Sequence, residues 1–359
     1  MLKKTKLRLG AVAAATVAAL AFGTMPAMAD PSGFKPLAGA GSDTTQDVVA
    51  GLASVIPAIG SYDATGGGNI QTKSGGNSFK RPNGSGDGVF ALGQSAQGGL
   101  YNGVDITGQL DFARSSSGPS GTSGALTYIP FAVDAVTFAV NVGSSFPRDI
   151  PLGSSATDNP DSSGLVPFTL RNIYRGAVTS FVDGEGNDVP IRALLPQSGS
   201  GTRSFWLTQL GLSSSPQVGT DLNGTVQEHD GSMVTGPGDI VPFSVAQYIA
   251  QGNHAAGLPT TVVERRSLVE LGNIGSTSPF KLTTAGSVST LSLNTAFPVK
   301  RTVYNVVQTS RLGESAIANT FVGSGSAVCQ NGALIQKYGF GTASNCGVTT
   351  ITGSFRTGA

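Results

Sequence analysis

Gln197-Ser198-Gly199-Ser200-Gly201-Thr202-Arg203-Ser204 joins an apolar run typical of a strand (191–195) to an apolar run typical of a helix (205–210). Its glycines allow a sharp turn and a close backbone approach to a ligand. Ser200 and Thr202 place hydroxyls and free N–H groups where the helix begins, and such a terminus favours anions. Arg203 adds a fixed positive charge. Taken alone, the stretch predicts either an anion site or an ordinary serine-capped helix start.

The first 29 residues have the pattern of a secretory signal peptide. A basic segment (3–8) precedes an apolar run (9–22), and Ala27-Met28-Ala29 provides an A-x-A cleavage motif. The sequence after this leader has no apolar run near the roughly 18 residues that a membrane span needs. No cysteine lies near the cleavage motif to carry a lipid. We therefore expect cleavage after Ala29 and a secreted chain, in the extracellular medium, cell wall or periplasm, without membrane insertion.

The charge balance argues against nucleic acid as a partner. Four of the 22 basic residues lie in the leader, which leaves 18 against 21 acidic residues in the mature part. A nucleic-acid-binding protein needs a basic balance or patch. The mature length is enough for two domains, and the 51 glycines indicate many turns. We expect a monomer that binds no nucleic acid.

Cys329 and Cys346 are the only cysteines in the sequence. In an exported chain they are expected to form a disulfide, the alternative being two free thiols. Closing a loop of this length stabilises a protein by roughly 3 kcal/mol. The bridge would hold the C-terminal segment in place.

Strand-like and helix-like runs alternate along the mature chain, which predicts an α/β architecture with a mainly parallel sheet. We expect helices at 48–56, 89–92, 168–174 and 205–210. We expect strands at 110–113, 191–195 and 297–307, and two segments long enough to cross between domains at 128–142 and 240–250.

Hydroxyl-rich turns recur near residues 43, 85, 115–117 and 200. Three of them lead into an expected helix, and the fourth follows an expected strand. In α/β sheets, ligands bind beyond the carboxyl ends of the strands. The four turns are therefore expected to converge on one ligand, which favours the anion site over a simple capped helix.

These turns resemble those of the phosphate-binding proteins of bacterial phosphate ABC transporters, and the type 2 periplasmic-binding-protein fold more widely. Five stretches carry the resemblance: Gly39-Ala40-Gly41-Ser42, Gly84-Ser85-Gly86-Asp87-Gly88, Asp111-Phe112-Ala113-Arg114-Ser115-Ser116, Ile129-Pro130-Phe131 to Asn141, and Gly199-Ser200-Gly201-Thr202. It implies a protein that closes two lobes on an oxyanion for ABC-type uptake and is not an enzyme. Each lobe would be a mainly parallel sheet flanked by helices. Behind a signal peptide (1–29), lobe 1 would comprise 30–131 and 247–359, and lobe 2 would comprise 132–246.

The resemblance also implies a ligand set, with phosphate as the expected ligand, sulfate as the alternative oxyanion and an ABC permease as the partner. The expected ligand-binding residues are Asp43, Thr44, Ser85, Ser115, Ser116, Ser200, Gly201, Thr202 and Arg203. The family's aspartate falls on Ser116 and its arginine on Pro196. Since a carboxylate only accepts hydrogen bonds and a guanidinium only donates them, we expect Asp43 to supply the acceptor and Arg203 or Arg114 the charge.

Other reactive side chains are expected to play structural or solvated roles. Glu228-His229-Asp230 has the residue types of a metal or acid–base cluster, but adjacent loop residues seldom converge, which favours a solvated polar turn. Lys300-Arg301 is expected to be a solvated basic pair, and Trp206 to lie in the core. The sequence contains no nucleophile elbow, metalloprotease or P-loop motif. We expect no catalytic residue, no metal and no cofactor.

Three functions are compatible with these observations. The first is a solute-binding protein that hands an oxyanion to a permease. The second is a secreted protein that uses the same fold outside transport, as an anion scavenger or a surface-interaction protein. The third and least expected is a phosphatase, because Ser200 as a nucleophile would need a base within hydrogen-bond reach.

Overall fold

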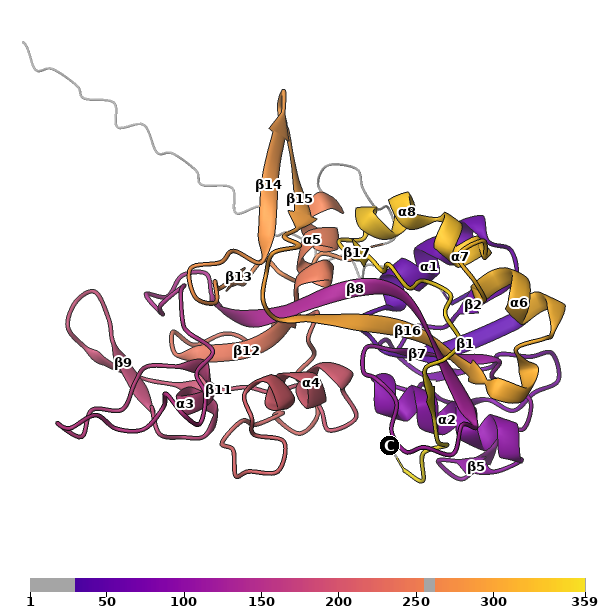
Figure 1. Cartoon of the computed structure of the whole chain (residues 1–359), viewed down its shortest axis with the longest axis horizontal. Coiled ribbons are helices and arrows are strands. Elements are labelled where there is room, and N and C mark those ends of the chain that lie inside the picture. The colour runs from indigo at the N-terminus through magenta and orange to yellow at the C-terminus, as the bar shows by residue number, and fades with distance from the viewer. Residues whose placement is uncertain (1–29, 255–261, 359) are drawn as a thin grey trace, which may run out of the picture.

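The computed structural model describes residues 30–254 and 262–358, so the expected signal peptide and its cleavage site lie outside the described residues. Two groups of helices and strands stand at either end of the molecule (Figure 1). Two long strands, β8 (Leu126–Asn141) and β16 (Lys300–Gln308), run between them. No helix within the described ranges has the length and apolar character needed to cross a bilayer.

One sheet runs through both groups, with strands in the order β11-β12-β8-β16-β7-β1-β2. At one end β1 (Leu37–Gly41) pairs in parallel with β2 (Ile59–Ser61) and β7 (Phe112–Ser115). At the other end β11 (Arg192–Ala193) pairs in parallel with β12 (Asp239–Ser244). The long strands pair antiparallel with each other and with their neighbours. The predicted α/β fold is confirmed, with parallel strand pairs at both ends of the sheet and antiparallel pairs in its middle.

Helices flank the sheet in both groups (Figure 1). They are α1 (Gln46–Val55), α2 (Ser85–Gln97), α3 (Leu170–Tyr174), α4 (Gly201–Gln209), α5 (Val245–His254), α6 (Ser315–Phe321), α7 (Ala327–Gln330) and α8 (Gly332–Lys337), with a short 3-10 helix at Thr309–Arg311. The remaining strands are β3 (Asn69–Ile70), β4 (Phe79–Lys80), β5 (Leu100–Tyr101), β6 (Val104–Asp105), β9 (Ser180–Val182), β10 (Asp188–Pro190), β13 (Val269–Leu271), β14 (Phe280–Ala285), β15 (Val288–Leu293), β17 (Gly341–Thr342) and β18 (Thr352–Gly353).

The crossing segment expected at 128–142 is confirmed as β8. The segment expected at 240–250 is a strand in its first half and a helix in its second half. β12 ends at Ser244, and α5 begins at the next residue. The carboxylate of Asp134, on β8, accepts the N–H of Ala246 at 3.1 Å, and Ser244 Oγ accepts the N–H of Gln247 at 3.3 Å. These acceptors satisfy first-turn N–H groups that a helix leaves unpaired. The second long connection is instead β16, near the late strand expected at 297–307.

Three clusters of buried apolar side chains form the core. One draws its members from 135–299, including Trp206, which is fully buried as expected. The other two draw theirs mainly from 37–132 and from the chain after Ala246. The segments at 269–274 and 293–299 pack in the first of these clusters. The division into lobes at residues 131 and 246 remains a prediction.

The disulfide between Cys329 and Cys346 is present, with the two Cα atoms 5.8 Å apart. It ties α7 to the segment that follows β17. The predicted pairing of the two cysteines is therefore confirmed.

Candidate functional site

The hydroxyl-rich turns lie where strands of one sheet end and helices begin. Thr44 lies between β1 and α1, Ser85 is the first residue of α2, and Ser116 follows β7. Gly41, at the end of β1, has a φ of 120°, and a Cβ there would lie 3.0 Å from the Cα of Gly88 on α2. Glycine is therefore required for α2 to pack its first turn against the end of β1.

Ser200 begins α4 from the other group of elements. Its Oγ accepts the N–H of Thr202 at 3.0 Å and the N–H of Arg203 at 3.2 Å. This is the N-cap geometry that the motif predicts. The capped helix start is thus present, and the anion role of the turn remains a prediction.

Side-chain hydroxyls from these four turns meet in the interior, and we call Thr44, Ser85, Ser116, Ser200 and Thr202 the hydroxyl cluster. The Oγ1 atom of Thr44 lies 3.3 Å from that of Thr202 and 3.4 Å from Ser116 Oγ. Ser85 Oγ lies 3.1 Å from Ser116 Oγ. Each of the five residues is at most 2% exposed. Turns that are distant in the sequence therefore converge as expected.

Gly201 lies directly against this cluster. A Cβ on Gly201 would lie 2.6 Å from both Ser85 Oγ and Ser116 Oγ, closer than atoms approach without displacement. Any larger residue would displace these two hydroxyl groups or α4 itself. Gly201 is therefore the position at which the two groups of elements approach each other closely.

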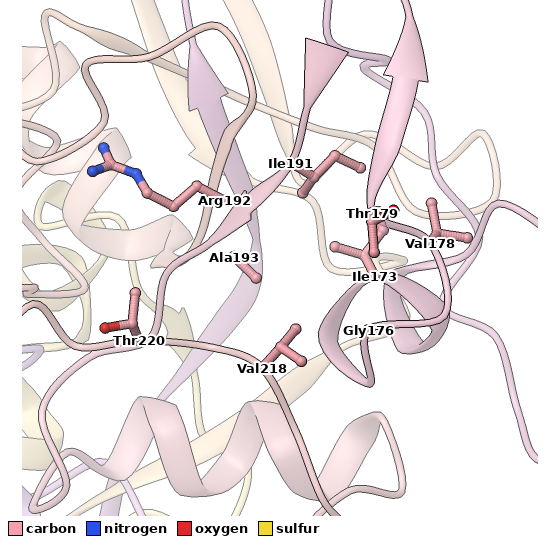
Figure 2. Close-up of a pocket in the computed structure, with 9 residues that line it drawn as sticks. All are labelled: Ile173, Gly176, Val178, Thr179, Ile191, Arg192, Ala193, Val218 and Thr220. Carbon is pink, nitrogen blue, oxygen red and sulfur yellow. The ribbon is translucent and has the colours of Figure 1, made fainter. Parts of the chain in front are cut away.

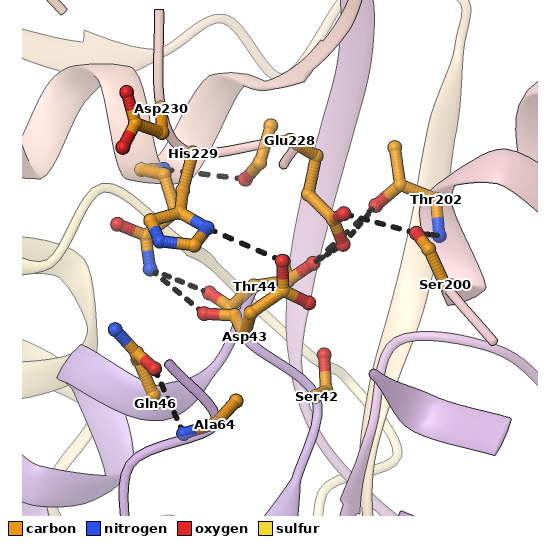
Figure 3. Close-up of polar contacts among 12 residues, drawn as sticks. Ser42, Asp43, Thr44, Gln46, Ala64, Ser200, Thr202, Glu228, His229 and Asp230 are labelled. Carbon is orange, nitrogen blue, oxygen red and sulfur yellow. Dashed lines mark hydrogen bonds and ion pairs between the residues drawn. The ribbon is translucent and has the colours of Figure 1, made fainter. Parts of the chain in front are cut away.

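Glu228 is the acceptor at the centre of the hydroxyl cluster (Figure 3). Its Oε1 accepts hydrogen bonds of 2.7 Å from Thr44 and 2.7 Å from Thr202. Its Oε2 accepts one of 2.9 Å from Ser200. Glu228 and His229 are 0% and 1% exposed, so the expectation of a solvated turn at 228–230 is wrong for both. The hydroxyl donors and an adjacent cation replace the water that a buried carboxylate loses.

Burial in this site makes the charged form of Glu228 costly. Together with the nearby negative charge of Asp43, it raises the pKa of Glu228 to about 7. Arg301 and the hydroxyl of Thr202 act in the opposite direction. Glu228 therefore changes its charge near neutral pH, which a solvated glutamate does not do.

Arg301 is the cation beside the cluster. Its Nη2 donates to Thr202 Oγ1 at 2.7 Å and pairs with the carboxylate of Asp134 at 2.9 Å. Its side chain is only 3% exposed, so the expectation of a solvated pair at 300–301 is wrong for Arg301. Its Nη1 has no hydrogen-bond partner in the part of the chain that the structure describes. One nitrogen of this buried guanidinium thus lacks a hydrogen-bond partner.

Asp43, expected as the ligand acceptor, pairs with His229 instead. His229 Nδ1 lies 3.2 Å from Asp43 Oδ2, and both residues are buried. Burial raises the pKa of Asp43, but the hydrogen bond and charge of His229 outweigh it and hold that pKa below its usual value. Burial likewise lowers the pKa of His229, but the bond to Asp43 outweighs it, and the net pKa is raised. The two therefore form a buried ion pair next to Glu228.

Three further residues expected near the ligand point elsewhere. Arg203 donates to the carbonyl of Pro196 at 3.0 Å, and its Nη1 lies 3.6 Å from Asp221. Ser115 donates to the carbonyl of Ser117 at 2.8 Å. Arg114 is fully buried, and its guanidinium donates to the carbonyls of Gly39, Gly41, Ser42 and Tyr62. Arg114 holds the first turn in place, and Arg301 takes the charged position expected of Arg203.

The local sequence holds only a weak signal for the two residues that were missed. Arg301 precedes the apolar run of a buried strand, where a solvated arginine would be unusual. Glu228 and His229 lie next to each other in a stretch with few other charges. Neither pattern predicts which distant residues bury these side chains.

A cleft of about 470 Å³ opens beside the hydroxyl cluster and contains Ser116 and Arg301 in its lining. A separate cleft of about 300 Å³ lies near α3 and β11 (Figure 2). That second cleft is lined mainly by aliphatic side chains, and its one charged lining residue, Arg192, donates to Asp239 at 2.7 Å. The first cleft is the one that shares residues with the hydroxyl cluster and with Arg301.

The site also contains the elements of a serine nucleophile. Ser200 has a carboxylate within hydrogen-bond reach, as such a nucleophile requires. However, its Oγ already accepts two N–H groups as the cap of α4, which engages the lone pairs that an attack would use. Residues 30–254 and 262–358 contain no group of three His, Cys, Asp or Glu arranged to hold a metal ion. The hydroxyl donors of this arrangement hold one anionic group, the carboxylate of Glu228.

Comparisons with known proteins agree with the fold. Residues 37–323 match a family model described as the PBP superfamily domain. No curated protein matches the chain.

Similar solved structures include a putative phosphate ABC transporter substrate-binding protein with bound phosphate from Clostridium perfringens. It is 16% identical, the match covers 86% of this chain and 99% of that one, and the TM-score is 0.49. An ABC-type phosphate transport receptor from Vibrio cholerae is 14% identical over 86% and 100% of the two chains, with a TM-score of 0.47. A phosphate binding protein from Stenotrophomonas maltophilia is 13% identical over 87% and 91%, with a TM-score of 0.48. The family assignment therefore rests on the match over residues 37–323.

Proposed function

Because the chain belongs to the PBP superfamily, the periplasmic-binding-protein family whose domain its residues 37–323 match, we propose that it is a secreted solute-binding protein. In this proposal it captures a small oxyanion, above all inorganic phosphate, between two lobes and delivers it for ABC-type uptake. Its role is binding without catalysis.

One observation carries the proposal: the hydroxyl cluster already surrounds an anionic group. Thr44, Ser200 and Thr202 all donate to the carboxylate of Glu228, and Arg301 lies beside them. Hydroxyl and guanidinium donors that bind a carboxylate also suit the oxygens of phosphate. A captured phosphate would take over these hydroxyl bonds when the lobes part and close again, with Ser85 and Ser116 at its edge.

Glu228 then supplies the acceptor that we expected from Asp43. A carboxylate only accepts hydrogen bonds, so it meets the proton of hydrogen phosphate favourably and a fully ionised sulfate oxygen unfavourably. The Asp43–His229 pair lies next to it and keeps Asp43 itself occupied. We therefore propose that the site prefers phosphate to sulfate through Glu228.

Isothermal titration of the mature chain with phosphate and with sulfate tests this function. We expect phosphate to bind at least ten times more tightly than sulfate. Thr202→Val, which removes a hydroxyl between Glu228 and Arg301, should weaken phosphate binding at least tenfold. Thr352→Val, on an exposed strand residue, is the matched control and should leave affinity unchanged. If neither phosphate nor sulfate binds at millimolar concentration, the proposal is excluded.

A second function is favoured by the same carboxylate. If Glu228 holds the cluster shut permanently, the protein would keep the fold but act outside transport, for example as a surface-interaction protein. That function predicts no phosphate binding by the wild type and clear binding by Glu228→Gln, because the substitution removes the competing charge. Binding by the wild type would favour the transport function.

A further inference from the structure

The cleft beside the hydroxyl cluster carries positive charge that no acidic residue in its lining balances. Arg301 and Arg356 both line it, and none of the described residues around it is an aspartate or a glutamate. Arg301 is partly neutralised by Asp134, whereas Arg356 makes no hydrogen bond or ion pair within the described ranges. An unpaired guanidinium next to a buried one favours a bound anion.

Arg356 lies beside the turn that carries Ser85, whereas Arg301 bonds to Thr44 and Thr202. A Cβ built on Gly86 would collide with Nη1 of Arg356, so this guanidinium lies on the first turn of α2, next to Ser85. Ser116, which bonds to Ser85, also lines the cleft. The hydroxyl cluster and the cleft therefore meet at Ser116, and both guanidinium groups line the same cleft.

The cleft is larger than inorganic phosphate requires. Its volume of about 470 Å³ falls within the roughly 300–1,000 Å³ typical of sites for small organic molecules. Beyond the two arginines its walls include the half-buried rings of Phe205 and Tyr304 and the hydroxyl of Ser204. Aromatic faces and hydroxyls are suited to the carbon atoms and hydroxyl groups of an organic alcohol.

We propose that this site accepts phosphate monoesters as well as inorganic phosphate, with the phosphoryl group between Arg301 and Arg356 and the organic group in the cleft. The inference rests on the proposed oxyanion-binding function and names its substrate class. No covalent step is involved. The ester is bound and released intact.

Titration of the mature chain with inorganic phosphate and with sn-glycerol 3-phosphate tests the inference. We expect the ester to bind at least as tightly as inorganic phosphate. Arg356→Ala should weaken both ligands at least tenfold, and Arg356→Lys, which keeps the charge, should recover part of the loss. Lys337→Ala, which removes a positive charge from the exposed surface of α8, is the control and should change neither affinity.

A second variant tests where the organic group lies. Ser204 is exposed on α4 and lines the cleft, so Ser204→Tyr should fold normally and narrow it. We expect at least tenfold weaker binding of glycerol 3-phosphate and an unchanged affinity for inorganic phosphate.

The outcomes separate this inference from the proposed function. Tight binding of inorganic phosphate with at least tenfold weaker binding of the ester would overturn the inference alone. So would an Arg356→Ala variant with unchanged affinities, or equal losses for both ligands in Ser204→Tyr. Failure of both ligands to bind at millimolar concentration would overturn the oxyanion-binding function as well.

Discussion

Glu228 accepts a hydrogen bond of 2.7 Å from the hydroxyl of Thr44, which lies 184 positions earlier in the chain. The bond links the turn after β1 to the loop that contains Glu228. Val226 in this loop packs in the core cluster drawn from residues 135–299. Thr44 and Glu228 are both fully buried. The protein thus closes its two groups of elements around a carboxylate of its own, and this carboxylate determines how an external anion would bind.

Sulfate binding is expected to depend on pH through Glu228. Sulfate does not titrate near neutrality, whereas the pKa of Glu228 is raised to about 7. As the pH falls from 8 to 6, the carboxyl gains a proton, loses its repulsion for sulfate and becomes a donor. Titration calorimetry should therefore show sulfate binding several-fold more tightly at pH 6. Glu228→Gln should bind sulfate at all these pH values and flatten the profile, and an unchanged slope in this variant would show that another group titrates.

Gly201→Ala is expected to destabilise the protein by about 1–3 kcal/mol, because the new Cβ would lie 2.6 Å from two buried hydroxyl oxygens. Gly332→Ala is the matched control, since Gly332 also begins a helix and a Cβ there meets no atom within 4 Å. Urea unfolding should leave the control neutral or more stable by about 0.5 kcal/mol. Equal effects at the two positions would contradict the close approach of α4 to Ser85 and Ser116.

Arg301, and not Arg203, is expected to support phosphate binding. Arg203→Ala should leave phosphate affinity within twofold, because its guanidinium bonds to Pro196 and Asp221. Arg301→Lys keeps one charge but loses the planar fork that serves Asp134 and Thr202 together, so at least tenfold weaker binding is expected. Circular dichroism would establish that both variants fold. A larger loss in Arg203→Ala than in Arg301→Lys would reverse this assignment.

Removing one partner of the buried Asp43–His229 pair should destabilise the protein by about 3–5 kcal/mol, because the other charge stays buried and unpaired. His229→Gln tests this by urea unfolding, and Asp43→Asn combined with His229→Gln should recover much of the loss. Asp230 lies in the same turn, but its ion pair with Arg265 is long, at 4.0 Å, and partly exposed. Asp230→Asn should therefore lower the free energy of unfolding by less than about 1 kcal/mol.

The contribution of His229 to the free energy of unfolding should decrease as the pH rises. Its pKa is raised in the folded protein, so its stabilising effect is complete below the unfolded value of about 6.5 and is lost as the pH rises through the folded value. The difference in unfolding free energy between wild type and His229→Gln should therefore shrink with rising pH. A difference that grows with pH would mean that His229 is neutral in the folded protein.

Patterns carried by neighbouring residues were enough to predict much of the fold. The apolar run at 128–142 predicts β8, the serine before the helical run predicts the cap of α4, and two lone cysteines in an exported chain predict their disulfide. The strand and the helix cap depend on the spacing and type of neighbouring residues. The disulfide depends on the presence of two cysteines, which allow one intramolecular pairing. The convergence of hydroxyl turns also followed, because strand ends in one sheet lie at a common edge.

The acceptor and the cation of the site could not be predicted in this way. The local sequence around Glu228 and Arg301 predicts solvated side chains. Both are buried because Thr44, Thr202 and Asp134 contact them from other elements. The start of α5 likewise depends on an acceptor from β8. Hydrogen bonds and ion pairs between segments that are far apart in the sequence leave no periodicity in the chain. Their partners are brought within reach only when the two groups of elements pack together.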